Sequence, residues 1–525
     1  MSLEKTSVDI AAAMITDPTA AKDWLLVTPT LLTMLGGAIA LITRKNVRLQ
    51  PWIGITALAL VFCANIALLN HVLNDGVVTM VMGSWLPPFG IAFTADPMGA
   101  MFATFASLVA LCTGIYAAGS IRPEERRYGF YPFLLMLLCG VSGAFLTGDI
   151  FNLYVWFEVL LISSFGLLVL GNKKRQIDGA VKYSLLNLLG TTLFLLATAL
   201  LYGLVGTLNM ADIAMKAAHL ENQGPLMGVA LLFFLAFAMK AAAFPVNFWL
   251  PASYHTPRIV VSAVFAGLLT KVGVYALLRV LLLLLPAGHN WMNTLITLVA
   301  ILTMLTGVMG ALAQTDVRRT IGYLVITGIG SMLAGLAVAS EWAVTGAIMY
   351  AVHSMIAMTG MFFVFGYIGK LQGTFSLREM GGMYRRSPIL AAVSLVLLFA
   401  AAGLPPFSGF WPKVLLVEGA LDKGMGWLAG VVLLTSILSI ICVGRLWIYV
   451  FLRGGSQSIA DGTMVALPQE KQKLPATVWL SVFPIVLMVV YIGLQPDAVM
   501  SFAHKGALTL LDPSAYVESV FGVAP

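Results

Sequence analysis

The chain has 525 residues, of which 60% are hydrophobic and 10% are charged, and its mean hydropathy is +0.94. Soluble domains carry roughly 25% charged residues, so this composition excludes a soluble globular protein and predicts an integral membrane protein. The formal charge of +7 does not indicate a nucleic-acid partner, because polytopic membrane proteins concentrate Lys and Arg in their cytoplasmic loops.

Apolar runs of about 20 residues recur along the chain, which is typical of spanning helices rather than of the short alternating strands of a transmembrane β-barrel. They predict an all-α polytopic fold with fourteen helices. In chain order, we expect the helices near residues 24–43, 52–73, 97–119, 128–147, 150–171, 180–206, 227–249, 258–285, 291–313, 321–340, 342–369, 388–421, 427–453 and 477–496. The segment 75–97 is too broken to span and alternates weakly, so it predicts a surface hairpin.

Lys and Arg are distributed unevenly between the loops, and this distribution tests the helix count. With fourteen helices, one side of the membrane collects 20 of these residues and the other side collects 5. Because positive residues favour the cytoplasmic side, the count predicts a multi-pass membrane protein with both termini outside the cytoplasm. The remaining 5 lie inside predicted spans: Lys240, Lys271, Arg279, Lys413 and Arg445.

Five ionisable residues lie deep in predicted spans: Glu158, Lys240, Lys271, His353 and Lys413. A charge at the centre of a membrane helix costs about 2.5–3.5 kcal/mol on insertion scales, so such residues usually mark an ion path. Structural ion pairs are the alternative. One deep carboxylate cannot neutralise three lysines, however, so the set favours a hydrated route for protons. His353 alone fits either a core histidine or a proton relay, since imidazole titrates near neutrality.

Two predicted helices contain a proline break beside a lysine. The stretch "AFPVNFWLP" at 243–251 follows Lys240, and "GLPPFSGFWPK" at 403–413 ends in Lys413. The similar order of proline, Phe-Trp and proline indicates an internal repeat, and units five helices apart would be inverted in the membrane. Paired broken helices point to an ion path, because their freed backbone groups must be satisfied by water or ions. A pair of packing kinks is the alternative.

Longer motifs surround these residues. They are "GDIFNLYVWFEVLLISSFGLLVLG" at 148–171, "FAMKAAAFPVNFWLPASYHTP" at 237–257, "SAVFAGLLTKVGVYALLR" at 262–279, "DVRRTIGYLVITGIGSM" at 316–332 and the second proline break. Together they resemble the D subunits (MrpD) of the Mrp-type multisubunit sodium/proton antiporters, over about residues 90 to 450. The antiporter-like superfamily also includes the proton-pumping membrane subunits of respiratory complex I and of membrane-bound hydrogenases.

The resemblance implies two inverted repeats, helices four to eight and nine to thirteen, with helices seven and twelve broken. It divides the chain into the first two helices with the hairpin (1–95), helix three (96–127), the two repeats (128–285 and 286–453), and a C-terminal loop, helix and tail (454–525). The relay residues of the family match Glu158, Lys240, Lys271, His353 and Lys413. Where family members often carry a further lysine, this chain has Met358, flanked by Thr359.

The sequence therefore predicts a proton-translocating subunit of a cation/proton antiporter rather than an enzyme. Its expected partners are other membrane subunits, protons and sodium. No cofactor or metal is expected, since the four cysteines lie in apolar runs without a CxxC spacing and no Gly-rich nucleotide loop is present. Two alternatives stay open: a proton-pumping subunit of a complex I-like NADH dehydrogenase or membrane-bound hydrogenase, and a structural scaffold with dispensable lysines.

The expected cycle starts from one ion pair. While Glu158 lies against Lys240, the charged lysine is favoured, and when the pair opens, burial favours release of the proton. The proton then moves toward Lys271 and through His353 to Lys413.

Overall fold

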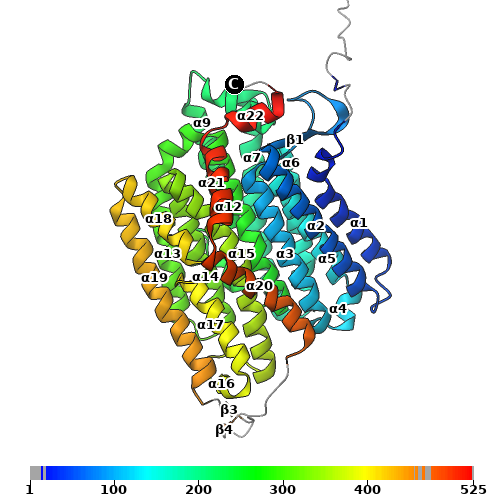
Figure 1. The fold of residues 1–525 in the computed structure, drawn as a ribbon, viewed down its shortest axis with the longest axis vertical. Helices are drawn as coiled ribbons and strands as arrows, with labels where there is room; N and C mark the ends of the chain where they lie inside the picture. Colours follow the sequence, from blue (N-terminus) through cyan, green and yellow to red (C-terminus); the bar gives the residue numbers. More distant parts are fainter. Residues whose placement is uncertain (1–13, 16–18, 455, 459–463, 467–473, 523–525) are drawn as a thin grey trace, which may run out of the picture.

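The computed structural model describes residues 14–15, 19–454, 456–458, 464–466 and 474–522. Its helices run roughly side by side in an elongated bundle (Figure 1). Eleven helices are long and apolar enough to cross a membrane: α2 (Gln50–Asp75), α3 (Pro97–Ser120), α6 (Ile150–Val169), α7 (Lys174–Val205), α9 (Gly224–Ala241), the segment Ile259–Leu284, α13 (Pro286–Ala313), α14 (Val317–Val338), α15 (Glu341–Gln372), the segment Gly426–Leu452 and α20 (Ala476–Leu494).

Two of these spans are composite. The first consists of α11 (Ile259–Val264), the π-helical turn η4 (Phe265–Leu269), α12 (Thr270–Leu278) and the π-helical turn η5 (Arg279–Leu284). The second consists of α19 (Gly426–Trp447) and η6 (Ile448–Leu452). Three shorter apolar helices are α1 (Thr28–Ile42), α5 (Phe130–Leu146) and α17 (Pro388–Ala402). An all-α membrane fold is thus confirmed, while the count of fourteen spans stays a prediction.

Short elements complete the chain. The helical ones are η2 (Asp23–Leu26), η3 (Met82–Ser84), α4 (Pro123–Arg127), α8 (Met210–Ala218), α10 (Trp249–Tyr254), α16 (Met383–Arg386), α18 (Phe410–Asp422), α21 (Asp497–Leu511) and α22 (Ser514–Phe521). Strands β1 (Val78–Val81) and β2 (Ala92–Ala95) pair antiparallel, with Val78 opposite Ala95, which confirms the expected hairpin. A second antiparallel pair joins β3 (Ser456–Ser458) to β4 (Met464–Ala466).

Polar caps and prolines define where many helices begin. Asp96, Asp149, Asp316 and Ser340 each accept a backbone N–H from the first turn of the helix that follows them. Proline occupies one of the first positions of α1, α2, α3, α9, α13 and α17, where its missing N–H leaves no bond unmade. These local signals determine the residue at which each of these helices begins.

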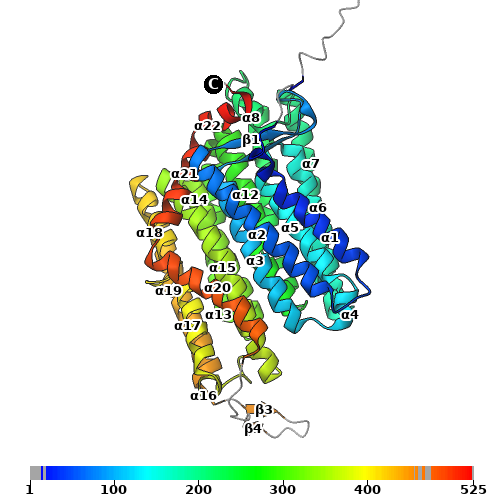
Figure 2. The same ribbon diagram turned by 45° about the vertical axis from the view of Figure 1, so that its right-hand side comes forward.

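The core of the bundle is built around α15. The most apolar stretch of this helix is 100% buried, because α3, α11, α14, α17, α18, α20 and α21 all pack against it. The last long span, α20, crosses the bundle obliquely and contacts both α3 and α17 (Figure 2). A polar group within this stretch of α15 therefore lies inside the protein rather than against lipid.

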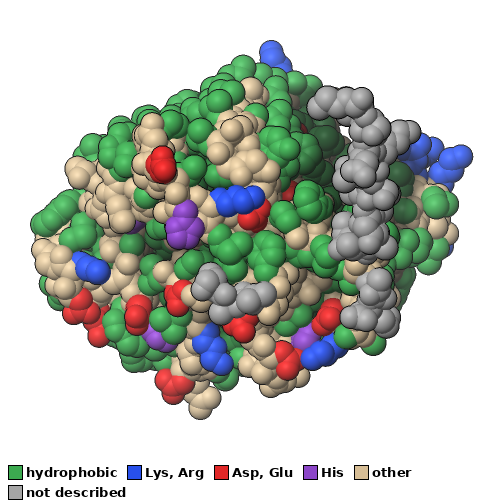
Figure 3. Space-filling view, turned by 90° about the horizontal axis from the view of Figure 1, so that it is seen from above, with side chains coloured by type: hydrophobic (Ala, Val, Ile, Leu, Met, Phe, Trp, Pro, Cys, Tyr) green, Lys and Arg blue, Asp and Glu red, His purple; other side chains and the backbone are tan. Residues whose placement is uncertain are grey.

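Both described ends of the chain lie at the same end of the bundle. Helix α22 packs against β1 and α8, and η2 also contacts β1 (Figures 1 and 2). Viewed from this end, the surface carries scattered acidic, basic and histidine side chains rather than one single-sign patch (Figure 3). Helices α4 and α16, which contain four arginines, lie at the opposite end (Figure 1).

Candidate functional site

The first helix break leaves Lys240 in the last turn of α9. Ala242 has a φ of 62°, which ends the helix, and α10 begins only at Trp249. Lys240 is 5% exposed, and its Nζ atom has no hydrogen-bond partner among the described residues. A buried amine without an acceptor is unfavourable, so the charge of Lys240 depends on which groups approach it.

Side chains of α13 satisfy the polar groups that the first break exposes. The Phe244 backbone N–H donates to Thr303 Oγ1 at 2.9 Å, and Asn247 Nδ2 donates to Thr306 Oγ1 at 2.8 Å. Non-helical backbone inside a membrane protein needs partners of this kind. Neither threonine stands out in the sequence, although both are hydroxyl side chains within a long apolar run.

Glu158 lies on α6 next to Lys240 without pairing with it. Lys240 Nζ is 5.8 Å from the centroid of the Phe157 ring, which immediately precedes Glu158. The ion pairs found in the described part of the chain do not include one between Glu158 and Lys240. Glu158 and Lys240 are thus unpaired in the structure, and formation of the expected ion pair stays a prediction.

Lys271 lies in α12 and is fully buried. Its Nζ atom donates to the carbonyl oxygen of Ala266 at 2.5 Å, within the π-helical turn η4. Such turns are uncommon and occur frequently at functional sites. A Cβ atom at Gly273 would lie only 2.7 Å from the Ala241 nitrogen. Glycine at this position therefore lets α12 touch the end of α9 that carries Lys240.

The centre of the expected relay lies where α15 crosses η4. The Thr359 hydroxyl donates to the carbonyl of Met355 at 2.7 Å and lies 3.3 Å from the carbonyl of Ala263. A Cβ atom at Gly267 would clash with Thr359 Oγ1, so the two helices are in close contact. Met358 is 1% exposed, and it places an apolar thioether where family members often carry an amine.

His353 reaches the second break from α15. Its Nδ1 atom lies 2.8 Å from Oγ of Ser408, a residue between α17 and α18, whereas Nε2 is buried and has no partner in the described residues. A Cβ atom at Gly409 would lie 3.0 Å from Nε2. Buried polar atoms are normally bonded, so a half-satisfied imidazole at a helix break is unusual for a core histidine.

Lys413 bridges the second break. It lies in the first turn of α18, and its Nζ atom donates to the carbonyl oxygen of Ala402, the last residue of α17, at 2.6 Å. Gly403 has a φ of 85°, and a Cβ atom there would lie 2.8 Å from Lys413 Nζ. The carbonyl end of a helix attracts cations, so the end of α17 favours the charged amine.

The structure gathers the five predicted residues into two groups without bonding them to one another. Lys240 and Glu158 lie near the first break with Lys271 on the adjoining helix, and His353 and Lys413 lie at the second break. Among the hydrogen bonds of the described residues, none joins two of the five. A proton passing between them therefore requires bridging groups or a rearrangement.

A sixth buried charge, Arg279, has a partner that sequence reasoning did not identify. Arg279 Nη2 lies 2.6 Å from Asp96 Oδ1, and the two side chains are 1% and 0% exposed. The guanidinium also donates to the Tyr275 hydroxyl at 3.0 Å and lies 5.2 Å from the ring centroid of Tyr516 on α22. The pair therefore connects α3, η5 and the C-terminal helix. The sequence feature that could have indicated it is an aspartate directly before an apolar run.

A helical membrane bundle with two broken helices, one beside the buried Lys240 and one beside the half-buried Lys413, defines the class of antiporter-like membrane subunits. Residues 147–439 match the family described as NADH:quinone oxidoreductase/Mrp antiporter, TM. The chain belongs to this family and, within it, to the D subunits of the Mrp antiporters.

Two relatives and one solved structure support this assignment. The D subunit of the Na(+)/H(+) antiporter of Alkalihalophilus pseudofirmus is 36% identical over 496 residues, which cover 94% of this chain and 99% of that protein. The protein of the same name from Bacillus subtilis is 34% identical over 495 residues, with 94% and 99% covered. A chain of the Mrp complex from Dietzia sp. DQ12-45-1b superposes with a TM-score of 0.89 at 26% identity, covering 96% of this chain and 100% of that one.

Proposed function

We propose that this chain is the proton-translocating subunit of a multisubunit sodium/proton antiporter in the bacterial cell membrane. The observation that carries the proposal is the set of buried and half-buried titratable groups near two helix breaks, in which Lys240 Nζ and His353 Nε2 lack hydrogen-bond partners among the described residues. Relatives named as D subunits of Na(+)/H(+) antiporters support sodium as the exchanged cation. The partners of the chain are the other membrane subunits of the complex.

The proposed cycle begins at Glu158 and Lys240. Approach of the Glu158 carboxylate favours the charged lysine, because an opposite charge compensates for lost hydration. Without the carboxylate, the buried amine has no acceptor among the described residues, so release of its proton is favoured. A neighbouring subunit that offers or removes a countercharge at Glu158 would shift the populations of these two arrangements.

The later steps use groups that can accept and donate. Lys271 is held by the Ala266 carbonyl, an acceptor that favours the ammonium form. With Nδ1 donating to Ser408, His353 presents Nε2 as a free acceptor on the way to Lys413. The Thr359 hydroxyl lies between these regions and can bridge the gap that Met358 leaves.

The proposed orientation places fourteen spans in the membrane and both termini outside the cytoplasm. The described ends lie with the β1–β2 hairpin at one end of the bundle, and the arginine-rich helices α4 and α16 lie at the other (Figure 1). Two described ends at the same end of the bundle fit an even number of spans, and the preference of positive loops for the cytoplasm supports this orientation.

Antiport measured in everted vesicles tests the proposal. Glu158→Gln, Lys271→Met and Lys413→Met, in the assembled complex, are each expected to lower the sodium-dependent pH change by about tenfold or more, because each removes a titratable step. Lys423→Gln is the matched control, since Lys423 is exposed just after α18. Normal antiport in Glu158→Gln or Lys271→Met would contradict the proposed relay.

A further inference from the structure

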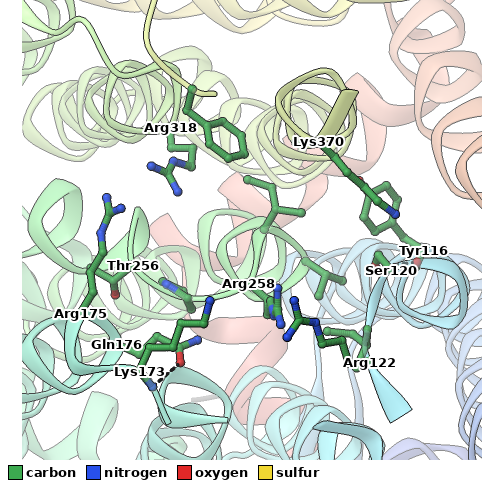
Figure 4. Close-up of a pocket in the computed structure, with 16 residues that line it drawn as sticks. Tyr116, Ser120, Arg122, Lys173, Arg175, Gln176, Thr256, Arg258, Arg318 and Lys370 are labelled. Carbon is green, nitrogen blue, oxygen red and sulfur yellow. Dashed lines mark hydrogen bonds between the residues drawn. The ribbon is translucent and has the colours of Figure 1, made fainter. Parts of the chain in front are cut away.

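A second site lies at the end of the bundle opposite α22, away from the relay residues. An open cavity of about 610 Å³ lies there between the first turns of α7, α11 and α14 and the last turns of α3 and α15 (Figure 4). Its charged lining is entirely cationic: Arg122, Lys173, Arg175, Arg258, Arg318 and Lys370. Of the described residues, no aspartate or glutamate lines it.

Only two of these six cations are neutralised by a carboxylate within the described ranges. Arg258 lies 2.7 Å from Glu125, and Arg318 lies 2.8 Å from Asp316, both measured between nitrogen and oxygen atoms. The other four, Arg122, Lys173, Arg175 and Lys370, have no ion pair within the part of the chain that the structure describes. These four side chains are exposed at the mouth of the cavity, and several like charges around one concave surface produce a positive potential that attracts an anion.

Burial and some of the same positive charges lower the pKa of the neighbouring His255. Burial and the charge of Arg319 lower the pKa of His255 to about 4, and the charges of Arg175 and Arg318 act in the same direction. The imidazole is consequently neutral at physiological pH. Its Nδ1 lies 2.8 Å from the Pro251 carbonyl and its Nε2 lies 3.2 Å from Arg319, which fits a neutral ring that donates at Nδ1 and accepts at Nε2.

The cations that line the cavity are donors of the kind that bind phosphate. The ends of the Arg175 and Arg318 side chains approach each other, Lys173 points into the cavity below them, and Arg258 lies beside Arg122 (Figure 4). Guanidinium groups bind phosphate oxygens in a bidentate manner, and the first turn of the long helix α7 adds a positive dipole. The volume lies within the range of about 300–1,000 Å³ that is usual for small-molecule sites.

We propose that this cavity binds a phosphate-bearing anion, either the headgroup of an anionic phospholipid or a soluble phosphate. Both share the chemistry that the cations recognise. Ile259, Val260 and Phe375 also line the cavity and provide an apolar wall for the glycerol end of a lipid. Basic pockets between membrane helices on the cytoplasmic side are a common setting for acidic headgroups.

The experiment uses the complete antiporter complex in phosphatidylcholine nanodiscs that contain a phosphatidylglycerol with a photoreactive group next to its phosphate. Peptide mass spectrometry locates the crosslinks, and equilibrium binding of radiolabelled pyrophosphate is measured in discs without the anionic lipid. The test variant is Lys173→Gln/Arg175→Gln. Its control, Lys45→Gln/Arg48→Gln, removes two exposed cations from the loop between α1 and α2.

Crosslinks at Tyr116, Ile259 or Lys370 identify a lipid, and saturable pyrophosphate binding without them identifies a soluble phosphate. In either case, Lys173→Gln/Arg175→Gln is expected to weaken binding about thirtyfold, about 2 kcal/mol at 1.4 kcal/mol per tenfold, and the control is expected to leave it unchanged. Arg122→Gln/Lys370→Gln, which removes charge from the other wall, is expected to behave like the first pair. The proposal is overturned by absence of both signals, by equal losses in test and control, or by crosslinks showing an acidic segment of another subunit in the cavity.

Discussion

Replacing Lys240 with methionine distinguishes a transport role for this lysine from a structural one. The side chain is 5% exposed and its Nζ atom has no partner among the described residues, so removing the amine breaks no observed bond. A charged lysine at the centre of a membrane helix costs about 2.5–3.5 kcal/mol. A neutral amine left unsatisfied costs about 1–3 kcal/mol. Methionine has a similar length and removes either cost.

We therefore expect Lys240→Met to abolish sodium-dependent antiport while leaving the complex equally stable or more stable by about 1–3 kcal/mol. Antiport is measured in everted vesicles, and stability is measured as the thermal dissociation of the purified complex. Lys423→Met, at an exposed position, controls for loss of a lysine in general. If Lys240 instead belonged to a structural ion pair, the change would strand a buried carboxylate and cost about 3–5 kcal/mol. A stability loss of that size, or retained antiport, would refute the reasoning.

Three further predictions follow from the topology, the central gap and the contact between α9 and α12. In a cysteine-free background, Lys174→Cys and Lys423→Cys should react with an impermeant thiol reagent from opposite sides of the membrane. Both positions are exposed, and they avoid the positive φ angles of the neighbouring Asn172 and Gly424. Labelling of both from the same side would refute the predicted span count. His353→Ala should lower antiport about tenfold or more, and adding Met358→Lys should restore part of it by supplying an amine on the same helix; normal antiport in His353→Ala would remove this residue from the relay. Gly273→Leu should impair antiport, because the new side chain would push α12 away from Ala241. Gly228→Leu should not, because a Cβ atom at Gly228 meets no described atom within 4 Å. Equal effects of the two changes would argue against a functional role for the contact between α9 and α12.

Hydropathy was enough to predict most helices, because a membrane span must be long, apolar and internally hydrogen-bonded. Their ends are set by other forces. The span expected at 180–206 begins at Lys174, since the Gln176 side chain accepts the Lys173 backbone N–H and charged residues are tolerated outside the apolar layer. The span expected at 388–421 is divided, with α17 ending at Ala402 and α18 beginning at Phe410.

The C-terminal helices were not predictable in the same way. The region after residue 496, expected as a tail, contains α21 and α22, which are too short or too polar to register as spans. Their order comes from tertiary contacts: Tyr516 lies over Arg279, and Ser519 Oγ lies 2.7 Å from Thr79 Oγ1 of the hairpin. Contacts between residues so distant in the chain leave no periodic signal in the sequence.

The candidate site was predictable only for its titratable members. Lys240, Lys271 and Lys413 stand out because a buried ammonium is rare and unfavourable in an apolar span. Their acceptors do not, because the Ala266 and Ala402 carbonyls that bind Lys271 and Lys413 belong to residues without any polar side chain. Only the three-dimensional course of the backbone, a π-helical turn in one case and a helix end in the other, makes these oxygens available.

The two breaks differ in a way that bears on direction in the proposed relay. Lys240 precedes its break and has no acceptor among the described residues, whereas Lys413 follows its break and donates to the Ala402 carbonyl at 2.6 Å. A helix-end carbonyl stabilises the ammonium form at all times, while a carboxylate that can approach and withdraw stabilises it only part of the time. In the proposed relay, we therefore expect Glu158 to control the proton of Lys240, and we expect Lys413 to retain its proton until its own surroundings change. From this asymmetry we expect the proposed cycle to be controlled by Glu158 at the first break and to release its proton at the second.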